Sequence, residues 1–532
     1  DITATATGAY EFVNWTAPAG TFADASAATT TFTMPSQAVT VTANFAIPVV
    51  YTFTDDEVKI GIAGEVGHAT GDMAFLGATL ATGMGAGTIT IDGEVLTVVI
   101  SKIDTKEAQD ETGEQGTLAM TAAIGGVDVV MGGFRTEAVE VYREVVMEAE
   151  KLFFNCGAAT ESLQHSVVDD YSTYRYWFKT TPPNEYFLAS SVLRILDAVA
   201  AQLRTELGLA ADATLDAVII SENLKWAALE QVPEYVDGLP ALNIDLVNEP
   251  YLVSALDPAD TVAALAHIQA NYDPHFVIPV YSGTMGVVFA QSMPVYVPDA
   301  MSVGINVMAQ LKQPWGATLL NPPGVTQPDC AYHIILDTWA TGVNQTALSG
   351  PFLAAFQFYA GGEYPLYTAA TFDALVTLKA ALEEVGYMEG GVPKAKADDI
   401  IAWFEDPDNA QMSTIGPGNT VYPQPGTTSG GKPALTEAQV ESIYDIAGYG
   451  YTYDAADWVM PRHTTHDLAY GPGRATGIGA QWQWSGAVWL KVGVWPMEFG
   501  EPKVDQYGDW DFQYDGTVPI EIPANVISHH MP

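Results

Sequence analysis

Apolar and polar residues form alternating blocks along most of this chain, and the blocks predict strands and helices in turn. Two apolar runs, 127–131 and 152–155, predict strands buried on both faces, as in a parallel sheet covered by helices. Apolar residues at helical spacing follow, most clearly over 190–207. Strands that alternate with helices indicate a doubly wound α/β architecture. Further strands are expected over 58–62, 95–100, 216–221, 244–252, 275–280 and 301–307, and further helices from about Met73 and over 261–272.

Glycines follow two of the predicted strands. Gly132 and Gly133 come directly after the run that ends at Met131, and Gly157 follows the run 152–155. Glycine lets a backbone approach a ligand closely, and ligands of open α/β sheets bind at the carboxyl ends of the strands. This edge of the sheet is therefore predicted to be a binding site.

Four segments resemble one family of proteins. They are 58–67 (VKIGIAGEVG), 125–163, 364–386 (YPLYTAATFDALVTLKAALEEVG) and 466–484 (HDLAYGPGRATGIGAQWQW). In this order they resemble type I periplasmic substrate-binding proteins, the branched-chain amino acid and amide receptors of ABC transporters. The resemblance covers about residues 55–496. It implies a body of two Rossmann-like lobes that needs no cofactor and delivers its ligand to an ABC permease.

The same resemblance divides the chain into lobes. Lobe 1 is expected over about 55–180 and 340–400, lobe 2 over about 184–330 and 475–496, and a C-terminal extension over 497–532. Three crossovers between the lobes are expected near Thr180, over 331–340 and near Ala475. The segment 174–184 is interpreted as a hinge crossing, and the region 389–465, rich in Gly, Pro and Ser, as loop with short helices.

The resemblance places a ligand-binding cleft between the lobes, for a small amino acid, amide or carboxylate. Backbone N–H groups and hydroxyls at two loop corners of lobe 1 would hold a carboxylate, and the dipoles of the following helices favour an anion there. An aromatic clamp from lobe 2 would desolvate the ligand and attract an ammonium group. The positions implied are Arg135, Thr136, Glu137, Gly157, Ala158, Ala159 and Thr160 in lobe 1, and Trp226, Tyr281 and Ser282 in lobe 2.

One corner departs from the family pattern. The family commonly shows Ser-Ser or Ser-Thr with a following Gly where this chain has Arg135, Thr136 and Glu137. The two charged side chains either pair with each other and fill the cleft, or select a different ligand. Arg135 has two interpretations, a solvated charge at a helix start or a ligand contact. Trp226 is likewise either the clamp or part of the core.

The first 48 residues have a different character. Short β-rich runs dense in Thr, Val and Phe are punctuated by Gly, Pro and Asn, which predicts a small all-β domain. The segments GAYEFVNW and VTVTANF resemble the divergent InlB-type B-repeat of surface proteins. The family's leading hairpin precedes the stretch that matches Ile2 to Ala6, so the repeat is interpreted as incomplete, with an unpaired edge. This edge predicts contact between copies of the protein or with the cell surface; the alternative is a simple spacer.

Charge and composition narrow the set of partners. The formal net charge is −44, from 64 acidic and 20 basic residues, which argues against nucleic acid and anionic lipid. No apolar run reaches about 18 residues, the length that a membrane span would need. The chain starts at Asp1 without a signal peptide, and with sequons at Asn14 and Asn344 we expect a processed, extracellular or cell-surface protein. Cys156 and Cys330 are expected to be buried small hydrophobes, with a disulfide as the alternative.

Signals for metal binding or catalysis are weak. His463 and His466 have a suitable spacing but no cysteine or carboxylate pattern completes a site, and His529-His530 is expected to belong to a flexible end. Nucleotide-phosphate motifs and a GxSxG elbow are absent from the sequence. No metal site and no catalytic residue is assigned. A solute-binding receptor ranks first, a structural subunit of a surface filament or layer second, and an enzyme last.

Overall fold

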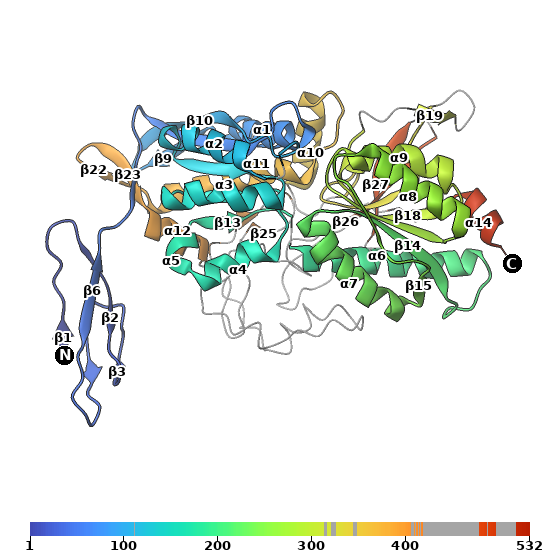
Figure 1. Cartoon of the computed structure of the whole chain (residues 1–532). Helices are drawn as coiled ribbons and strands as arrows, with labels where there is room; N and C mark the ends of the chain where they lie inside the picture. Colours follow the sequence, from blue (N-terminus) through green and yellow to red (C-terminus); the bar gives the residue numbers. More distant parts are fainter. Residues whose placement is uncertain are drawn as a thin grey trace.

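The protein consists of two α/β lobes with a small β domain attached to the first of them (Figure 1). The computed structural model describes residues 1–531 apart from 111, 183, 313–316, 321–325, 344–347, 406–408, 410, 413, 415–416, 419–477, 487 and 496–517. The expected strands 58–62 and 275–280 lie in different sheets, as a two-lobed body requires. The expectations for 419–465, His463, His466, Asn344 and the third crossover fall outside the described residues.

Lobe 1 contains a sheet of six strands in the order β13-β12-β11-β8-β10-β9. All neighbours are parallel except β9, which pairs antiparallel with β10. The strands are β8 (Glu57–Gly64), β9 (Thr88–Ile91), β10 (Glu94–Asp104), β11 (Val129–Gly132), β12 (Phe153–Asn155) and β13 (Trp177–Lys179). The last of these occupies part of the segment expected to be a hinge crossing, because its three buried residues complete the sheet edge.

Helices from both halves of the sequence cover this sheet. Gly77 of α1 allows a close contact with the segment ahead of α11, because a Cβ there would lie 2.2 Å from the carbonyl oxygen of Ala369. Thr368 Oγ1 donates to the carbonyl of Thr70 at 2.8 Å and fixes the same approach. The helices are α1 (Ala69–Ala81), α2 (Glu114–Ala123), α3 (Thr136–Glu148), α4 (Glu161–Asp169), α5 (Tyr171–Tyr174), α10 (Ser349–Tyr359), α11 (Thr371–Val385) and α12 (Ala397–Glu405).

Lobe 2 contains an eight-stranded sheet in the order β15-β14-β17-β18-β21-β26-β27, with β16 also paired to β14. The strands from β14 to β21 are parallel, and β26 and β27 add an antiparallel edge. They are β14 (Leu215–Glu222), β15 (Ile244–Leu246), β16 (Tyr251–Val253), β17 (Phe276–Tyr281), β18 (Met301–Asn306), β21 (Ile334–Asp337), β26 (Ile478–Trp484) and β27 (Trp489–Trp495). The helices are α6 (Glu185–Glu206), η3 (Lys225–Gln231), α7 (Val232–Gly238), α8 (Pro258–Asn271) and α9 (Met285–Tyr296).

Three expectations about lobe 2 need correction. The single strand expected over 244–252 is two short strands, and Pro250, which has no N–H to donate, lies in the break. β21 lies within the expected crossover 331–340, so the sheet of lobe 2 continues past residue 330 to Asp337. Residues 518–531 are packed rather than loose: α14 (Ala524–His530) buries Val526 against lobe 2.

The N-terminal domain is built from short antiparallel pairs. β2 (Glu11–Thr16) pairs with β6 (Thr42–Ala46), and two pairs of shorter strands, β1 with β4 and β3 with β5, complete the domain. Trp15 is its buried centre at 8% exposure, with its indole N–H donated to the carbonyl of Ala27 at 3.0 Å. The remaining strands are β1 (Ile2–Thr3), β3 (Thr21–Phe22), β4 (Thr29–Thr30) and β5 (Phe32–Thr33).

A short strand joins this domain to lobe 1. β7 (Val50–Thr52) pairs antiparallel with β23 (Val392–Lys396), which also pairs with β22 (Tyr387–Glu389). Cys156 and Cys330 are both free and buried, in agreement with the preferred expectation. Among the described helices, none combines the length and the apolar character that a membrane crossing demands.

Candidate functional site

The first loop corner of lobe 1 is organised around a buried carboxylate. Glu107 accepts hydrogen bonds from the backbone N–H groups of Phe134 at 3.0 Å and Arg135 at 3.3 Å, and from the hydroxyl of Tyr142 at 3.1 Å. Burial raises the pKa of Glu107 to about 7, against the opposing effect of these donors. The backbone N–H groups just ahead of α3 are therefore already bound to a carboxylate of the protein itself. Arg135 and Thr136 form the start of the helix.

The second loop corner is closed by its own amide side chain. Asn155 Oδ1 accepts from the N–H groups of Gly157 at 3.2 Å and Ala158 at 3.0 Å, and its Nδ2 donates to the carbonyl of Ala158 at 2.7 Å. A Cβ on Gly157 would lie 2.0 Å from the carbonyl oxygen of Gly133, so these glycines bring the two corners together. The N–H groups of Gly157 and Ala158, expected as ligand donors, are thus engaged within the loop.

The two corners meet through hydroxyls at their helix starts. Thr136 Oγ1 and Thr160 Oγ1 lie 2.7 Å apart, and both residues are buried. The carbonyl of Ala159 accepts from Lys179 Nζ at 2.9 Å, which brings a cation behind the second corner. The amino ends of α3 and α4 therefore lie side by side, as the parallel order of β11 and β12 requires.

Lobe 2 presents a second buried carboxylate. Glu222, at the carboxyl end of β14, accepts from the N–H of Ser282 at 2.9 Å and from the indole N–H of Trp226 at 2.9 Å, and the Ser282 hydroxyl also bonds to it. Burial raises the pKa of Glu222, and the charge of Arg135 acts in the opposite direction. Trp226, only 6% exposed, belongs both to this site and to the core of lobe 2.

Tyr281 lies apart from these groups. Its hydroxyl is 3.2 Å from Thr261 Oγ1 and its ring centroid is 5.4 Å from that of Phe289, within the core formed with α8 and α9. Its neighbour Ser282 is the residue of this pair that reaches Glu222. Of the three positions implied in lobe 2, Trp226 and Ser282 therefore lie together at Glu222, and Tyr281 lies in the core.

Arg135 crosses from lobe 1 to lobe 2. Its side chain is 2% exposed, which contradicts the interpretation as a solvated charge. A Cβ added to Gly283 of lobe 2 would lie 2.9 Å from its Nη2, so the guanidinium reaches the loop after β17. Its positive charge lowers the pKa of His68, in the same direction as burial. It also opposes the effect of burial on Tyr367, whose pKa is raised overall. One buried cation thus faces groups from both lobes.

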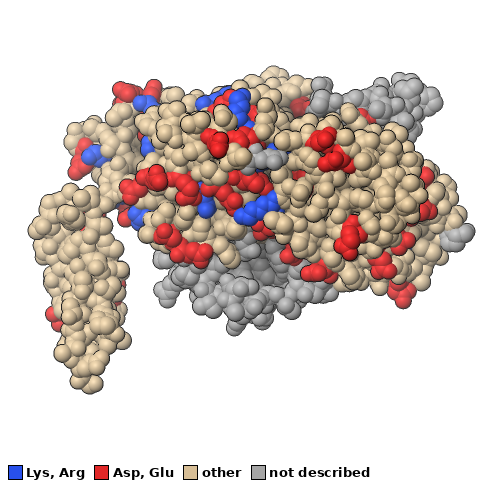
Figure 2. Space-filling view, in the orientation of Figure 1, with Lys and Arg blue, Asp and Glu red and all other residues tan. Residues whose placement is uncertain are grey.

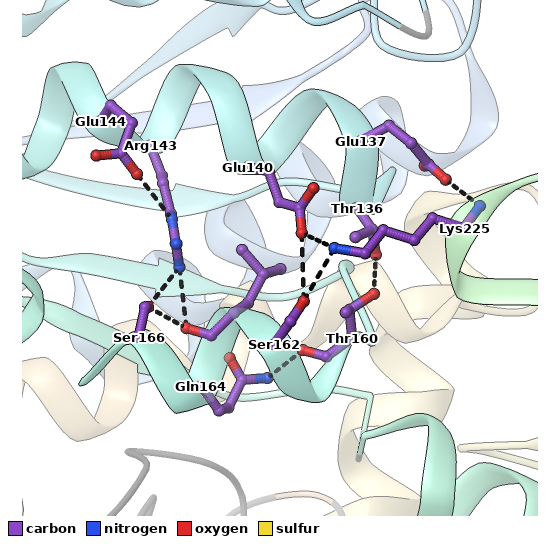
Figure 3. Close-up of polar contacts among 11 residues, drawn as sticks. Thr136, Glu137, Glu140, Arg143, Glu144, Thr160, Ser162, Gln164, Ser166 and Lys225 are labelled. Atoms are coloured by element: carbon purple, nitrogen blue, oxygen red, sulfur yellow. Dashed lines mark hydrogen bonds and ion pairs between the residues drawn. The ribbon is translucent and has the colours of Figure 1, made fainter. Parts of the chain in front are cut away.

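A lysine of lobe 2 ties the two lobes together (Figure 3). The N–H of Lys225 donates to Glu137 Oε1 at 2.6 Å, and its ammonium group forms an ion pair with Glu140. The same Nζ lies 3.1 Å from Ser162 Oγ on α4. Figure 3 shows this side chain reaching between α3 and α4. Arg135 and Glu137 do not pair with each other, which was the first of the two expected alternatives. Each side chain reaches across to lobe 2.

Sequence reasoning missed Glu107, Glu222 and Lys225. Glu222 directly follows the apolar run 216–221, so the rule that ligands bind at strand ends would have pointed to it. Lys225 precedes Trp226, which was identified. Glu107 lies in a loop without periodicity and carried no such signal.

Charged side chains cover only part of the visible surface, and acidic ones predominate among them (Figure 2). In this view the basic side chains lie over lobe 1 and its border with lobe 2, and the charged side chains of lobe 2 away from that border are acidic. The buried charges described above, Arg135 and Glu222, are also of both signs.

Comparison with solved structures agrees with the fold. The chain shares its fold with an ABC transporter solute-binding protein from R. palustris in complex with 4-hydroxybenzoate, with a TM-score of 0.52 and 11% identity over 82% of this chain and 96% of that one. A solute-binding protein of an ABC transporter from Rhodopseudomonas palustris BisB5, in complex with 3,4-dihydroxybenzoic acid, gives a TM-score of 0.51 and 13% identity over 82% and 96%. The expected type I periplasmic binding protein fold is thereby confirmed.

The N-terminal domain matches a separate family. Residues 1–48 match the family model of the divergent InlB B-repeat domain, in agreement with the resemblance of that segment. No curated protein matches the chain. At 11–13% identity, the similarity to these solved structures shows the fold and does not identify a ligand for this chain.

Proposed function

We propose that this chain is an extracellular solute-binding protein that captures a small amino acid, amide or carboxylate between its lobes and delivers it to an ABC permease. The observation that carries this proposal is the buried guanidinium of Arg135, which faces lobe 2 from the start of α3. A buried cation beside two helix amino ends is suited to a carboxylate. The two benzoate complexes among the proteins of similar fold are consistent with a carboxylate ligand.

The opposite side of the proposed site has complementary chemistry. Glu222 and Ser282 would accept from or donate to an ammonium, amide or hydroxyl group on the same ligand. The indole of Trp226 would cover its apolar part. A ligand with a carboxylate at one end and a hydrogen-bond donor at the other would then be complementary in charge to Arg135 and Glu222.

Ligand entry requires the lobes to separate. Opening would release the ion pair of Lys225 with Glu140 and the hydrogen bond of its N–H to Glu137. Both partners of the ion pair are about one third exposed, with side-chain exposures of 34% and 30%, so this tie is weak enough to open. Ligand contacts would take its place on closure, and affinities in the micromolar range, about −8 kcal/mol, are expected.

The test is a binding screen on the full chain. Aliphatic amino acids, amides, short carboxylates and hydroxybenzoates are screened by thermal shift, and hits are measured by calorimetry. Arg135→Gln is expected to weaken a carboxylate hit by at least about tenfold, because it removes a charged hydrogen bond of about 1.5–3 kcal/mol. Arg175→Gln is the matched control, since that arginine pairs with Asp398 at 2.7 Å elsewhere in lobe 1. A flat screen, or equal losses in both variants, would refute the proposal.

A second candidate is a structural subunit of a cell-surface filament or layer. The direct tie from Lys225 to Glu137 and Glu140 favours it, because these contacts hold the lobes together through the protein's own side chains. The match of residues 1–48 to a B-repeat domain adds a module through which copies could associate. Deletion of residues 1–48, followed by mass measurement in solution and electron microscopy, tests this candidate. Assembly that survives the deletion would leave the N-terminal domain as a spacer.

A further inference from the structure

The C-terminal segment brings two histidines to the end of lobe 2 that is farthest from lobe 1 (Figure 1). α14 ends at His529 and His530, and both rings face the loops that precede β17 and β18. One ligand atom each from Asp273, His529 and His530 lies within 4.8 Å of the others. Asp273 comes from the loop between α8 and β17, so the cluster joins segments far apart in the sequence.

The three groups already have nearly the spacing of metal ligands. His529 Nε2 lies 2.7 Å from Asp273 Oδ1, with side chains 40% and 72% exposed. Two donors bound to one tetrahedral Zn²⁺ at about 2.0–2.1 Å each are about 3.3 Å apart. Insertion of the ion would therefore require the carboxylate and the imidazole to separate by only about 0.6 Å. The exposed side leaves room for water to complete the coordination.

Both imidazoles also have outer partners of the kind that orient metal ligands. His529 Nδ1 lies 3.4 Å from Asp299 Oδ2, on the ring edge opposite to Asp273. His530 Nε2 lies 2.9 Å from the backbone carbonyl oxygen of Asp299. A neutral His530 that donates this hydrogen bond keeps its lone pair on Nδ1. Ligating histidines typically donate their second nitrogen to a carboxylate or a carbonyl in this way. His275 supports the arrangement by stacking on His530, with ring centroids 4.3 Å apart.

We propose that Asp273, His529 and His530 bind a divalent transition metal ion, with Zn²⁺ as the preferred ion. Two imidazoles and one carboxylate suit Zn²⁺, and the same set also accepts Co²⁺ and Ni²⁺. Ca²⁺ and Mg²⁺ prefer sites made of oxygen ligands, which this cluster does not offer. The acidic visible face of lobe 2 raises the local concentration of cations around the site (Figure 2).

Bound metal would fasten the C-terminal segment to lobe 2. Val526 of α14 is 1% exposed, and Asn525 Nδ2 donates to the carbonyl of Pro298 at 2.7 Å, so the segment already packs on the lobe. The ion would add a bond from the end of α14 to the loop before β17.

The proposal is tested on the full chain freed of metal with a chelator. Calorimetric titration with ZnCl₂ is expected to show one site that H529A/H530A removes and that His267→Ala, an exposed histidine of the same lobe, retains. Asp273→Asn, which alters only a surface side chain, is expected to weaken the same site by at least about tenfold, and Asp299→Asn by about 10–100-fold through the orientation of His529. Co²⁺ is expected to give visible absorption bands that are lost in the same variants.

Either of two results would overturn the proposal. Titration of the wild type without binding heat excludes a metal site at this end of lobe 2. A site that persists unchanged in H529A/H530A lies elsewhere in the chain. Circular dichroism spectra of Asp273→Asn and the wild type are compared first, so that a loss of binding is not confused with a loss of folding.

Discussion

We expect the buried ion pair between Lys491 of β27 and Asp337 of β21 to contribute strongly to the stability of lobe 2. Both side chains have an exposure of 0%. Lys491 Nζ also donates to the carbonyl of Gln310 at 2.8 Å and lies 4.6 Å from the ring centroid of Tyr364. Asp337 Oδ1 accepts the N–H of Thr338 at 2.6 Å, where the chain leaves the sheet of lobe 2. The pair therefore fixes the antiparallel edge and the start of a crossover together.

The size of the effect follows from burial. Lys491→Met leaves the Asp337 carboxylate in a dry interior, and breaking one side of a buried pair costs about 3–5 kcal/mol. Asp337→Asn costs a similar amount, because it leaves the ammonium group buried. The asparagine oxygen still accepts from Thr338, so the double variant replaces two charges with a neutral pair of similar shape. It is expected to be more stable than the sum of the two losses by at least about 2 kcal/mol.

Urea unfolding of the full chain, followed by tryptophan fluorescence, measures these losses. Because several domains unfold, the transition assigned to lobe 2 is compared among variants rather than one global value. Lys379→Met is the control, since its pair with Glu383 is partly exposed at 24% and 33% and is expected to cost less than about 0.5 kcal/mol. Losses that add within about 0.5 kcal/mol in the double variant would refute the reasoning, as would a cost of Lys491→Met below about 1 kcal/mol.

Three further predictions concern single buried side chains. Burial raises the pKa of Glu107 from 4.5 to about 7, so the folded state binds this proton more tightly and stability falls as the pH rises between these values. This fall amounts to roughly 3 kcal/mol in the free energy of unfolding, and it is expected to be absent in Glu107→Gln. Urea unfolding of both proteins at pH 5 and pH 8 measures it, and an equal pH dependence in the two proteins would contradict the prediction. Burial raises the pKa of Cys156 to about 12 and also that of Cys330, so a thiol reagent at pH 8 is expected to label neither thiol before unfolding and both afterwards, by mass spectrometry; only one labelled thiol, or none, after unfolding would count against this. Trp15→Ala is expected to cost the N-terminal domain about 3–5 kcal/mol and to expose residues 1–48 to protease, with an unchanged melting temperature of the lobes; equal protease resistance would show that the domain does not depend on this indole.

The sequence predicted the architecture well because most of its strands are largely apolar runs. The segments 58–62, 127–131 and 301–307 correspond to β8, β11 and β18, since a strand buried on both faces favours apolar residues. β13 and β21 were interpreted as parts of crossovers because each is short and lies in a segment where the chain was expected to pass between the lobes. The packing of α14 could not be predicted, since it depends on contacts of Val526 and His529 with residues far away in the sequence.

The candidate site was predictable in position and much less in chemistry. The family resemblance implied Arg135, Thr160 and Trp226 as site positions, and the structure brings the corresponding loops of both lobes together. Which donors remain for a ligand depends on side chains that fold back locally, as Asn155 does onto Ala158. Such hydrogen bonds follow from three-dimensional proximity and leave no periodic pattern in the sequence.

The way the N-terminal domain joins lobe 1 determines how the protein would bear tension. β7 is held along β23 by antiparallel pairing, and Tyr51 and Phe53 on either side of its end are buried in lobe 1. A pull on the N-terminal domain would therefore be resisted by this ladder and by the core of lobe 1. Lobe 2 lies on the other side of lobe 1 from this domain (Figure 1). In a chain tethered by its first 48 residues, the tension would therefore enter lobe 1 before it could reach lobe 2.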